Sequence, residues 1–470
     1  METIGKHEKR QTRKEAAHIR KIRRIKSRIM SVLLTGSLFF VPAMTVSGST
    51  LSEPAPSGLT MTSPQKPLSN APLLSWDKNF DAIAYEMEIF SDNIKNLDPL
   101  DNDSRAIYRT TAIYTNFYEL PLYEISDKLP KNGPVYWRVR ALKLGKQAIS
   151  PFSELVPLYT DASLPHMNAP IPRKTNPMAK GAAMLYPVYG WIRPTNASSF
   201  EVQIFAEDPD KNSLARPISV YTAPIAELYD TKPRMGDTTY YWRVRSLGED
   251  GKPIGDWSKV SGFRTSPSDH WKIAVFGDSI SHGGGRLSFG PEDLEYSWLH
   301  YLDSNAVNLS QSGNLTSDML ARFERDVVPF HPEYLIIMGG TNDLRSDEYT
   351  LENTIKNMNA IEEKCRRYGI KPIFLTLPPI NPANIIRAFD EPTTPDWKQR
   401  FARFNDFLRT KPHIDVAKSF AAYSSENGEL PEWLGYDGLH EDVIGKQLIA
   451  ARVNAEWETA VQAADEWFKQ

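Results

Sequence analysis

The chain is 470 residues long, which exceeds one ordinary domain and suggests about three. Its formal net charge of −3 at pH 7 provides no overall positive field and so argues against nucleic acid as a partner. Cys365, the only cysteine, excludes an intrachain disulfide. It lies in a predicted helix without His or Cys at metal-ligand spacing, so it is not expected to bind a metal.

Basic residues crowd positions 1–28, and the apolar run 29–46 follows them directly. This order is typical of a secretory targeting signal. Small residues at 47–49 could form a cleavage site, and Gly36 and Pro42 weaken the run as a permanent bilayer helix. The long basic segment keeps open an uncleaved anchor whose basic end stays in the cytoplasm. We expect export to the periplasm, the cell surface or the medium, with residues 29–50 as a signal peptide or membrane anchor.

The chain repeats itself after a linker predicted at 51–69. Residues 85–90 are echoed by 200–205, and residues 136–141, Tyr-Trp-Arg-Val-Arg-Ala, return at 241–246 as Tyr-Trp-Arg-Val-Arg-Ser. The two pairs differ in offset, which predicts a longer loop in the first copy, around 91–105. Trp76 and Trp191 hold equivalent early positions in the two copies.

Each copy alternates large and polar residues with the period of half-buried strands, which predicts an all-β sandwich of about 100 residues. The early Trp, the Tyr-Trp-Arg-Val-Arg strand and a closing aromatic-Ser pair resemble fibronectin type III modules, at 70–160 and 168–266. The tryptophans are expected to anchor the cores. A solvent face is expected for four arginines, Arg138, Arg140, Arg243 and Arg245. The modules are interpreted as spacers, with contact to a glycan or a protein left open.

From residue 270 to the C-terminus, strand-like and helix-like segments alternate, which predicts a parallel sheet with crossover helices. Strands are expected at 273–276, 306–309, 334–338 and 372–377. Helices are expected at 317–328, 349–368, 396–409 and from 441 onward. The proline-containing segment 381–397 is predicted to be a loop that borders the pocket.

Polar groups follow the first three predicted strands, and adjacent parallel strands would bring these tips into one crevice. Ser279, in Gly-Asp-Ser after the first strand, is a candidate nucleophile. Acyl transfer also needs N–H donors aimed at the oxygen that becomes negative. The backbone N–H of Gly313, the side-chain amide of Asn342 and the backbone N–H of Ser279 are candidates for this oxyanion hole.

A candidate base lies near the end of the chain, in Gly-Tyr-Asp-Gly-Leu-His at 435–440. His440 follows Asp437 by three residues on a loop before a helix. The imidazole could accept the serine proton, and the carboxylate could fix its tautomer and stabilise the imidazolium. The chain order Ser, Asp, His is one of the known solutions to this geometry.

Four ordered blocks, from Gly277-Asp278-Ser279 through Gly313 and Gly340-Thr341-Asn342-Asp343 to Asp437-Gly438-Leu439-His440, resemble those of the GDSL/SGNH hydrolase family. The resemblance covers residue 271 to the C-terminus. It implies a flavodoxin-like α/β/α domain of a family whose members hydrolyse esters and sometimes thioesters. It also implies that the nucleophile is Ser279, the base His440, the orienting acid Asp437 and the oxyanion donors Ser279, Gly313 and Asn342.

The sequence does not match other catalytic and nucleotide-binding motifs that share some of these residues. The serine block lacks the final Gly of G-x-S-x-G, and the glycines at 283–285 are followed by neither Lys-Ser/Thr nor the last Gly of a dinucleotide fingerprint. These glycines are expected to form a flexible lip beside the nucleophile. His282 is interpreted as a lip residue and not as the base.

The sequence therefore predicts a two-step serine esterase that needs neither a cofactor nor a metal. An exported hydrolase behind two β modules favours acylated carbohydrate as the substrate, with O-acetyl groups on polysaccharide or cell-wall glycan, an expectation that rests on family analogy. The enzymatic alternative is a lysophospholipase or thioesterase that acts on lipid acyl esters. An alternative of another class is a surface adhesion or glycan-binding protein.

Overall fold

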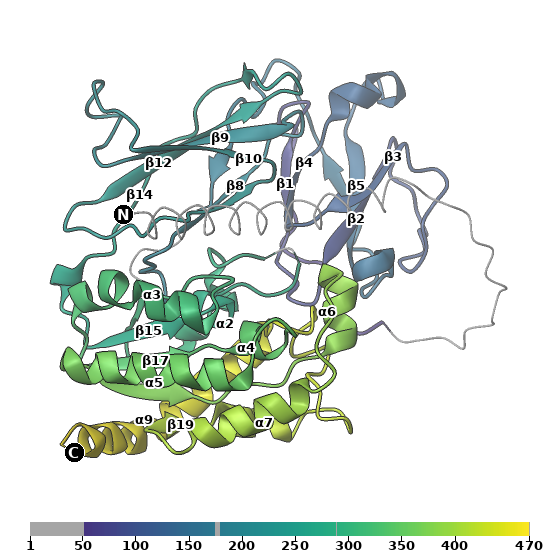
Figure 1. Cartoon of the computed structure of the whole chain (residues 1–470). Helices are drawn as coiled ribbons and strands as arrows, with labels where there is room; N and C mark the ends of the chain where they lie inside the picture. The colour runs from purple at the N-terminus through teal and green to yellow at the C-terminus, as the bar shows by residue number, and fades with distance from the viewer. Residues whose placement is uncertain (1–50, 174–178, 288, 470) are drawn as a thin grey trace.

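The computed structural model describes residues 51–173, 179–287 and 289–469. The predicted basic segment and targeting run lie outside the described residues. Antiparallel sheets occupy the upper half of Figure 1, and an α/β domain occupies the lower half. Within the three described ranges, no helix has both the length and the apolar character needed to cross a membrane.

The first antiparallel unit contains two sheets. One pairs β1 (Leu73–Ser75) with β4 (Phe117–Glu119), and the other has the order β3 (Tyr108–Ile113), β2 (Ala84–Phe90), β5 (Val135–Leu142), β6 (Val156–Leu158). Short 3-10 helices lie at Leu122–Lys128 and Leu144–Lys146. Trp76 and Trp137 are buried in one apolar cluster with residues of both sheets. Their predicted role as core anchors is confirmed.

The second antiparallel unit repeats this plan. One sheet has the order β10 (Ser219–Ala223), β9 (Ser199–Phe205), β12 (Tyr240–Leu247), β13 (Pro253–Ile254), and β14 (Ser261–Phe263) also pairs with β12. The other has the order β11 (Glu227–Tyr229), β8 (Val188–Ile192), β7 (Ile171–Pro172). Trp191 and Trp242 are buried in the shared cluster. The antiparallel sheets confirm the all-β expectation, and the fibronectin type III assignment stays a prediction.

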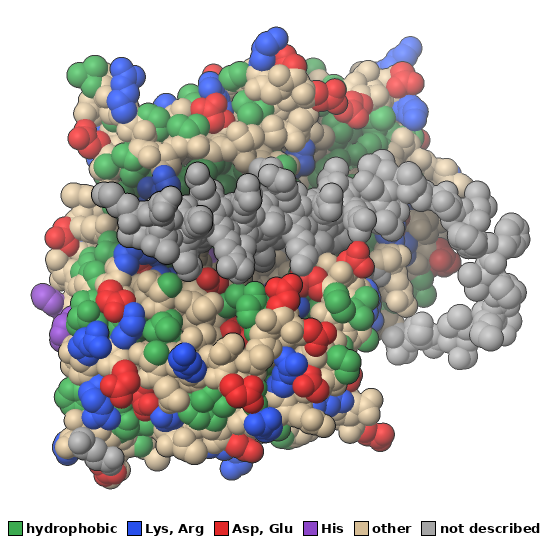
Figure 2. All heavy atoms as spheres, in the orientation of Figure 1, with side chains coloured by type: hydrophobic (Ala, Val, Ile, Leu, Met, Phe, Trp, Pro, Cys, Tyr) green, Lys and Arg blue, Asp and Glu red, His purple; other side chains and the backbone are tan. Residues whose placement is uncertain are grey.

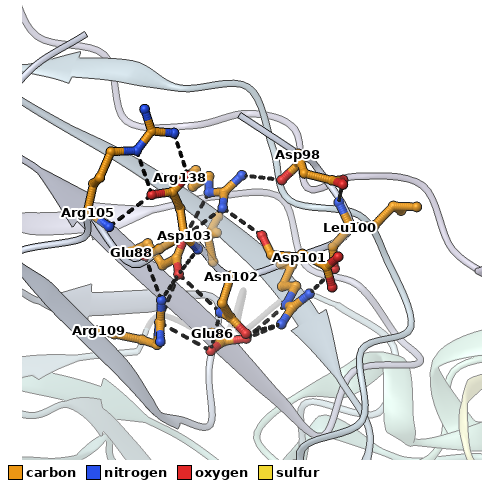
Figure 3. A network of polar contacts seen from close by, with 12 residues as sticks. Glu86, Glu88, Asp98, Leu100, Asp101, Asn102, Asp103, Arg105, Arg109 and Arg138 are labelled. Carbon is orange, nitrogen blue, oxygen red and sulfur yellow. Dashed lines mark hydrogen bonds and ion pairs between the residues drawn. The ribbon is translucent and has the colours of Figure 1, made fainter. Parts of the chain in front are cut away.

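The predicted solvent face of arginines is wrong for the first unit. Arg138 and Arg140 are buried, and their Nη2 atoms lie 2.7 Å from carboxylate oxygens of Glu88 and Glu86. The loop at 91–105 covers them, and its main-chain carbonyls accept further guanidinium hydrogen bonds (Figure 3). The alternation along the strand is correct, but the long loop of the first copy encloses the polar face.

The arginines of the second unit remain half-buried. The guanidinium groups of Arg243 and Arg245 lie 4.3 and 4.4 Å from the ring of Trp257. Arg245 also pairs with Glu201 at 2.7 Å. The same strand pattern therefore leaves these two cations partly in solvent.

The α/β domain contains a five-stranded parallel sheet, which confirms that part of the predicted fold. Its spatial order is β16 (Val307–Asn308), β15 (Ile273–Gly277), β17 (Tyr334–Met338), β18 (Lys371–Leu375), β19 (His413–Ile414). Numbered along the chain, this is the order 2-1-3-4-5 of flavodoxin-like sheets. The first four strands overlap the predicted ones, and the two-residue β19 was not predicted.

The helices of this domain include the four predicted ones, at α3 (Thr316–Asp326), α5 (Leu351–Arg367), α7 (Trp397–Leu408) and α9 (Val443–Lys469). Further helices are α2 (Ser279–His282), α4 (Thr341–Leu344), α6 (Pro382–Phe389) and α8 (Val416–Ala421), with 3-10 turns at Pro267–Asp269, Leu294–Tyr296, Trp298–Tyr301 and Val328–Phe330. Helix α5 packs against α3 and α7, and α9 packs on β18 and β19 (Figure 1).

The prediction of a loop at 381–397 is wrong for Pro382–Phe389, which form helix α6. Pro382 occupies the first turn of this helix, where a missing N–H costs nothing. The side chain of Asn381 caps the helix by accepting from the N–H of Asn384 at 3.2 Å. Cys365 is a buried free thiol in α5, as expected of a helix residue.

A segment of the second unit completes the edge of the parallel sheet. The N–H of Leu185 donates to the carbonyl of Asn308 in β16, and the N–H of Asn308 donates to Ala183, each at 2.8 Å. Leu185 and Tyr186 are fully buried in the core of the α/β domain. The predicted domain boundaries stay predictions, but this core includes residues that precede position 270.

Charges of both signs are mixed over the visible face of the α/β domain. In Figure 2, Lys and Arg side chains alternate with Asp and Glu over helices α5 and α7. This face therefore presents no extended field of one sign that would concentrate a charged polymer.

Candidate active site

Ser279 lies at the point where β15 gives way to α2. Asp278 caps the helix, because its Oδ1 accepts from the N–H of Ile280 at 3.0 Å. Gly277 is required just before it, since a Cβ there would lie 2.1 Å from the carbonyl oxygen of Met338. This close approach of β15 and β17 places Ser279 as the first residue of the helix, at the carboxyl edge of the sheet, with its side chain partly exposed.

The loop before α9 brings His440 to this serine. Nε2 of His440 lies 2.8 Å from Oγ of Ser279, and Nδ1 lies 2.8 Å from Oδ2 of Asp437. The other carboxylate oxygen of Asp437 accepts from the main-chain N–H groups of Leu439 and His440. Gly438, at a φ of 77°, makes the tight turn that folds this loop back on its own aspartate.

The charge of Asp437 sets the hydrogen-bond direction in this chain of three residues. Burial alone would raise the pKa of the Asp437 carboxyl, but His440 and the two main-chain N–H groups outweigh burial and hold the pKa below its ordinary value. An ionised carboxylate can only accept, so Nδ1 of His440 carries the proton. Nε2 is then free to accept the hydroxyl proton of Ser279, which is the arrangement that activates a serine.

The predicted oxyanion donors follow adjacent strands of the sheet. Gly313 is exposed in the turn after β16 and adopts a φ of 80°, and Ser279 carries a first-turn N–H of α2 that has no intrahelical acceptor. Asn342, in α4, donates one N–H to the carbonyl of Asn314 at 3.0 Å and accepts from Nε of Arg345 at 3.4 Å. These contacts orient the amide and leave its second N–H for a ligand.

Arg322, which the sequence analysis did not identify, links the ends of β15 and β16 near the site through hydrogen bonds. This buried side chain donates to the carbonyl of Gly277 at 3.0 Å, to that of Leu309 at 2.6 Å and to Oδ1 of Asn314 at 2.5 Å. Its guanidinium also stacks 4.2 Å from the ring of Phe276. One sequence signal could have identified Arg322: it lies on the apolar face of α3, three positions after Met319 and next to Phe323.

The prediction that His282 and the glycines at 283–285 form a lip is wrong, because all four residues are buried. Nε2 of His282 lies 2.7 Å from the carbonyl of Tyr186, and Nδ1 lies 2.8 Å from Oγ of Ser312. The N–H of Gly284 donates to Tyr296, so the glycine turn packs inward against the following segment. His282 does not contact Ser279 through its ring and is not the base in this geometry.

The described part of the chain contains no group of three or more His, Cys, Asp or Glu side chains arranged to hold a metal ion.

Comparison with known proteins finds a family match within the α/β domain. Residues 275–448 match the model of the GDSL-like Lipase/Acylhydrolase family. These residues form a GDSL-like acylhydrolase domain, the domain of a serine ester hydrolase. The matched range begins in β15, before Ser279, and ends in α9, beyond His440.

Individual relatives are distant. An uncharacterized lipoprotein, YqeF, of Bacillus subtilis is 29% identical over 123 residues, which are 24% of this chain and 50% of that protein, so the chain spans about half the length of this curated relative. The lipase/acylhydrolase from Enterococcus faecalis is 23% identical with a TM-score of 0.32, over 40% of this chain and 96% of that one. An acetylxylan esterase from Geobacillus stearothermophilus is 20% identical with a TM-score of 0.31, over 40% and 93%.

Proposed function

We propose that this protein is an exported serine esterase that removes small acyl groups, with O-acetyl groups on carbohydrate or cell-wall glycan as its substrates. The observation that carries the proposal is the unbroken chain of 2.8 Å contacts from Asp437 through His440 to the hydroxyl of Ser279. A buried carboxylate, an oriented imidazole and a partly exposed hydroxyl in this order are the parts that nucleophilic acyl transfer needs.

In the first step, Nε2 of His440 takes the hydroxyl proton while Oγ of Ser279 bonds to the ester carbonyl carbon. Asp437 stabilises the imidazolium that forms. The tetrahedral intermediate then collapses, the carbon–oxygen bond to the alcohol breaks, and His440 gives its proton to the departing alkoxide. The product is an acyl-enzyme on Ser279.

In the second step, water attacks the acyl carbonyl while His440 takes its proton. Collapse of the second intermediate returns that proton to Oγ of Ser279 and releases the carboxylic acid. The negative oxygen of both intermediates is assigned to the N–H groups of Ser279, Gly313 and Asn342. Removing one such donor in a serine hydrolase costs ~10²–10³ in kcat.

A small acyl group is favoured by what lies beside the base. The ring of Phe389, at the end of α6, stands edge-on to the imidazole of His440 with centroids 6.0 Å apart. Helix α6 thus restricts the space on this side of the site, which suits an acetyl group better than a long acyl chain.

The wider setting supports a substrate in the cell envelope. The basic and apolar N-terminal segments predict export, and the relative in Bacillus subtilis bears the name of a lipoprotein. The two antiparallel units are proposed to be fibronectin type III-like modules that hold the esterase away from its attachment point. Their paired sheets around a Trp-centred core support that assignment.

The test measures acetate released by the full chain from acetylated xylan, pectin, sialic acid and peptidoglycan. Nitrophenyl acetate and nitrophenyl octanoate are compared in parallel, and Ser279→Ala is the control. We expect acetate release from at least one glycan, a preference for the acetyl ester and no turnover by Ser279→Ala. A preference for octanoate would instead favour the lipid acyl hydrolase, and undiminished turnover by Ser279→Ala would refute the assignment.

A further inference from the structure

His282 connects the turn that carries Gly313 to a segment of the second antiparallel unit. On one side, its Nε2 lies 2.7 Å from the main-chain carbonyl of Tyr186. On the other, its Nδ1 lies 2.8 Å from Oγ of Ser312 and 3.3 Å from the N–H of the same residue. Ser312 directly precedes Gly313.

These three contacts are consistent with only one state of the ring. A carbonyl can only accept, so Nε2 of His282 carries the proton and donates to Tyr186. Nδ1 is then the acceptor for both the hydroxyl and the N–H of Ser312. Burial agrees with a neutral ring, since it lowers the pKa of His282 to about 4.

The helix that carries the nucleophile also carries this histidine. Helix α2 contains both Ser279 and His282, and the side chain of Asn308 donates to the carbonyls of Ser281 and His282 at 3.0 and 3.1 Å. His282 therefore has a fixed backbone, a fixed tautomer and fixed partners on both ring nitrogens.

We propose that His282 is a positioning residue that holds the Gly313 N–H in place for the oxyanion, by linking Ser312 to the main chain at Tyr186. The proposal rests on the function proposed above, in which Gly313 is an oxyanion donor. Gly313 is exposed and has no side chain of its own to anchor it. Its two neighbours are anchored instead, Ser312 by His282 and Asn314 by Arg322.

Such anchoring has a catalytic effect because an oxyanion hole works by preorganisation. Donors that are already in place need not reorganise when charge develops on the substrate oxygen. If the donor is displaced by a few tenths of an ångström, its hydrogen bond to the transition state weakens more than its hydrogen bond to the bound ester. Loss of His282 should therefore lower kcat and leave KM nearly unchanged.

The segment at Tyr186 gives the second antiparallel unit a direct part in the site. Residues 183–185 pair with β16, and Tyr186 supplies the carbonyl that fixes the His282 ring. On this inference the unit is more than the spacer that the sequence suggested, because it supplies one end of the link that supports Gly313.

The first experiment compares His282→Phe, His282→Gln and Ser312→Ala in the full chain with nitrophenyl acetate. We expect His282→Phe to lower kcat about 10–100-fold with KM within about twofold. His282→Gln, whose amide offers one donor and one acceptor, should recover much of that loss. Ser312→Ala should lower kcat less, and combining it with His282→Phe should add little, since both remove the same link.

His300→Phe is the matched control. Its ring also contacts the main chain of the preceding segment, at the carbonyl of Lys180, but contacts none of the residues proposed for the site. It should keep the kcat of the parent protein. If folded His282→Phe and Ser312→Ala both keep the parent kcat, the positioning role is refuted.

A second readout does not depend on activity. Amide hydrogen exchange of residues 309–316 should be faster in His282→Phe and in Ser312→Ala than in the parent protein and in His300→Phe. Unchanged exchange in both variants would overturn the link whatever the enzyme hydrolyses. Turnover that survives Ser279→Ala would overturn the proposed function instead, so the two failures are distinguishable.

Discussion

Nη2 of Arg286 lies 2.5 Å from Oδ1 of Asp81, which joins the turn after α2 to the first antiparallel unit. The same guanidinium lies 3.5 Å from Asp442 and 5.7 Å from the ring of Tyr436. Only 4% of the Arg286 side chain is exposed. One buried cation therefore connects the antiparallel region, the segment after Ser279 and α2, and the loop that carries His440.

Replacing Arg286 with Met should destabilise the protein by ~3–5 kcal/mol, because it leaves the buried Asp442 without its cation. Burial already raises the pKa of Asp442 to about 7, against the opposing effect of Arg286. Asp81→Asn is the matched control, since Asp81 is half exposed and its loss should cost under ~1 kcal/mol. Urea unfolding measures both, and equal losses would contradict this account.

Asp437→Asn should lower kcat by ~10²–10⁴ and change the fold little. An amide at this position can donate to Nδ1 of His440, which favours the tautomer that cannot accept the Ser279 proton. Steady-state kinetics on nitrophenyl acetate and circular dichroism check the two halves of this prediction. A variant that keeps full kcat would show that the carboxylate does not set the imidazole tautomer.

Arg322→Lys should lower kcat about tenfold, because one ammonium cannot hold the carbonyls of Gly277 and Leu309 and the side chain of Asn314 together. Arg325→Lys is a close control. Arg325 pairs with the same Asp326 as Arg322 but contacts none of the strand ends. The prediction is wrong if the two variants lose the same activity.

In Glu292→Gln, the free energy of unfolding should decrease less between about pH 4.5 and 8 than it does in the parent protein. Burial raises the pKa of Glu292 to about 8, with Glu227 and Asp293 adding to the rise and Arg173 opposing it. The folded protein therefore binds a proton over this range that the unfolded chain releases, so the free energy of unfolding declines as pH rises. The Gln variant has no such proton to lose.

Chemical denaturation at pH 5 and pH 8 tests this prediction. Asp278 and Asp442, whose pKa values burial raises to about 7, give a similar slope in both proteins. The difference between parent and variant therefore isolates Glu292. A gap in stability that stays constant from pH 5 to pH 8 would rule out titration of this carboxyl.

The parts of the site that the sequence predicted have local patterns. The ends of the strands could be predicted because the apolar runs stop at Gly, Asp and Ser. The pairing of Asp437 with His440 could be predicted because the two residues are only three positions apart. His282 and Arg322 could not be assigned in this way. Their partners lie 96 residues away at Tyr186 and 45 residues away at Gly277, and only the fold brings them together.

Two fold predictions failed, one on a local pattern and one on a long-range contact. Prolines in 381–397 indicated a loop, although Pro382 follows the capping residue Asn381 and suits a first helical turn. For Arg138 and Arg140 the strand alternation was read correctly. Their burial depends on where the 91–105 loop lies, which the strand's own pattern does not encode.

The pairing of residues 183–185 with β16 has a consequence for how the protein is made. Translation delivers this segment well before β15 and β16 emerge, so a docking partner for the outer strand already exists when the parallel sheet starts to assemble. A protein that begins at residue 270 would lack that partner. Its strand β16 would then have unpaired main-chain N–H and C=O groups, and a cavity would remain where Leu185 and Tyr186 pack. Such an edge invites self-association, and a soluble truncated enzyme should therefore start upstream of residue 179.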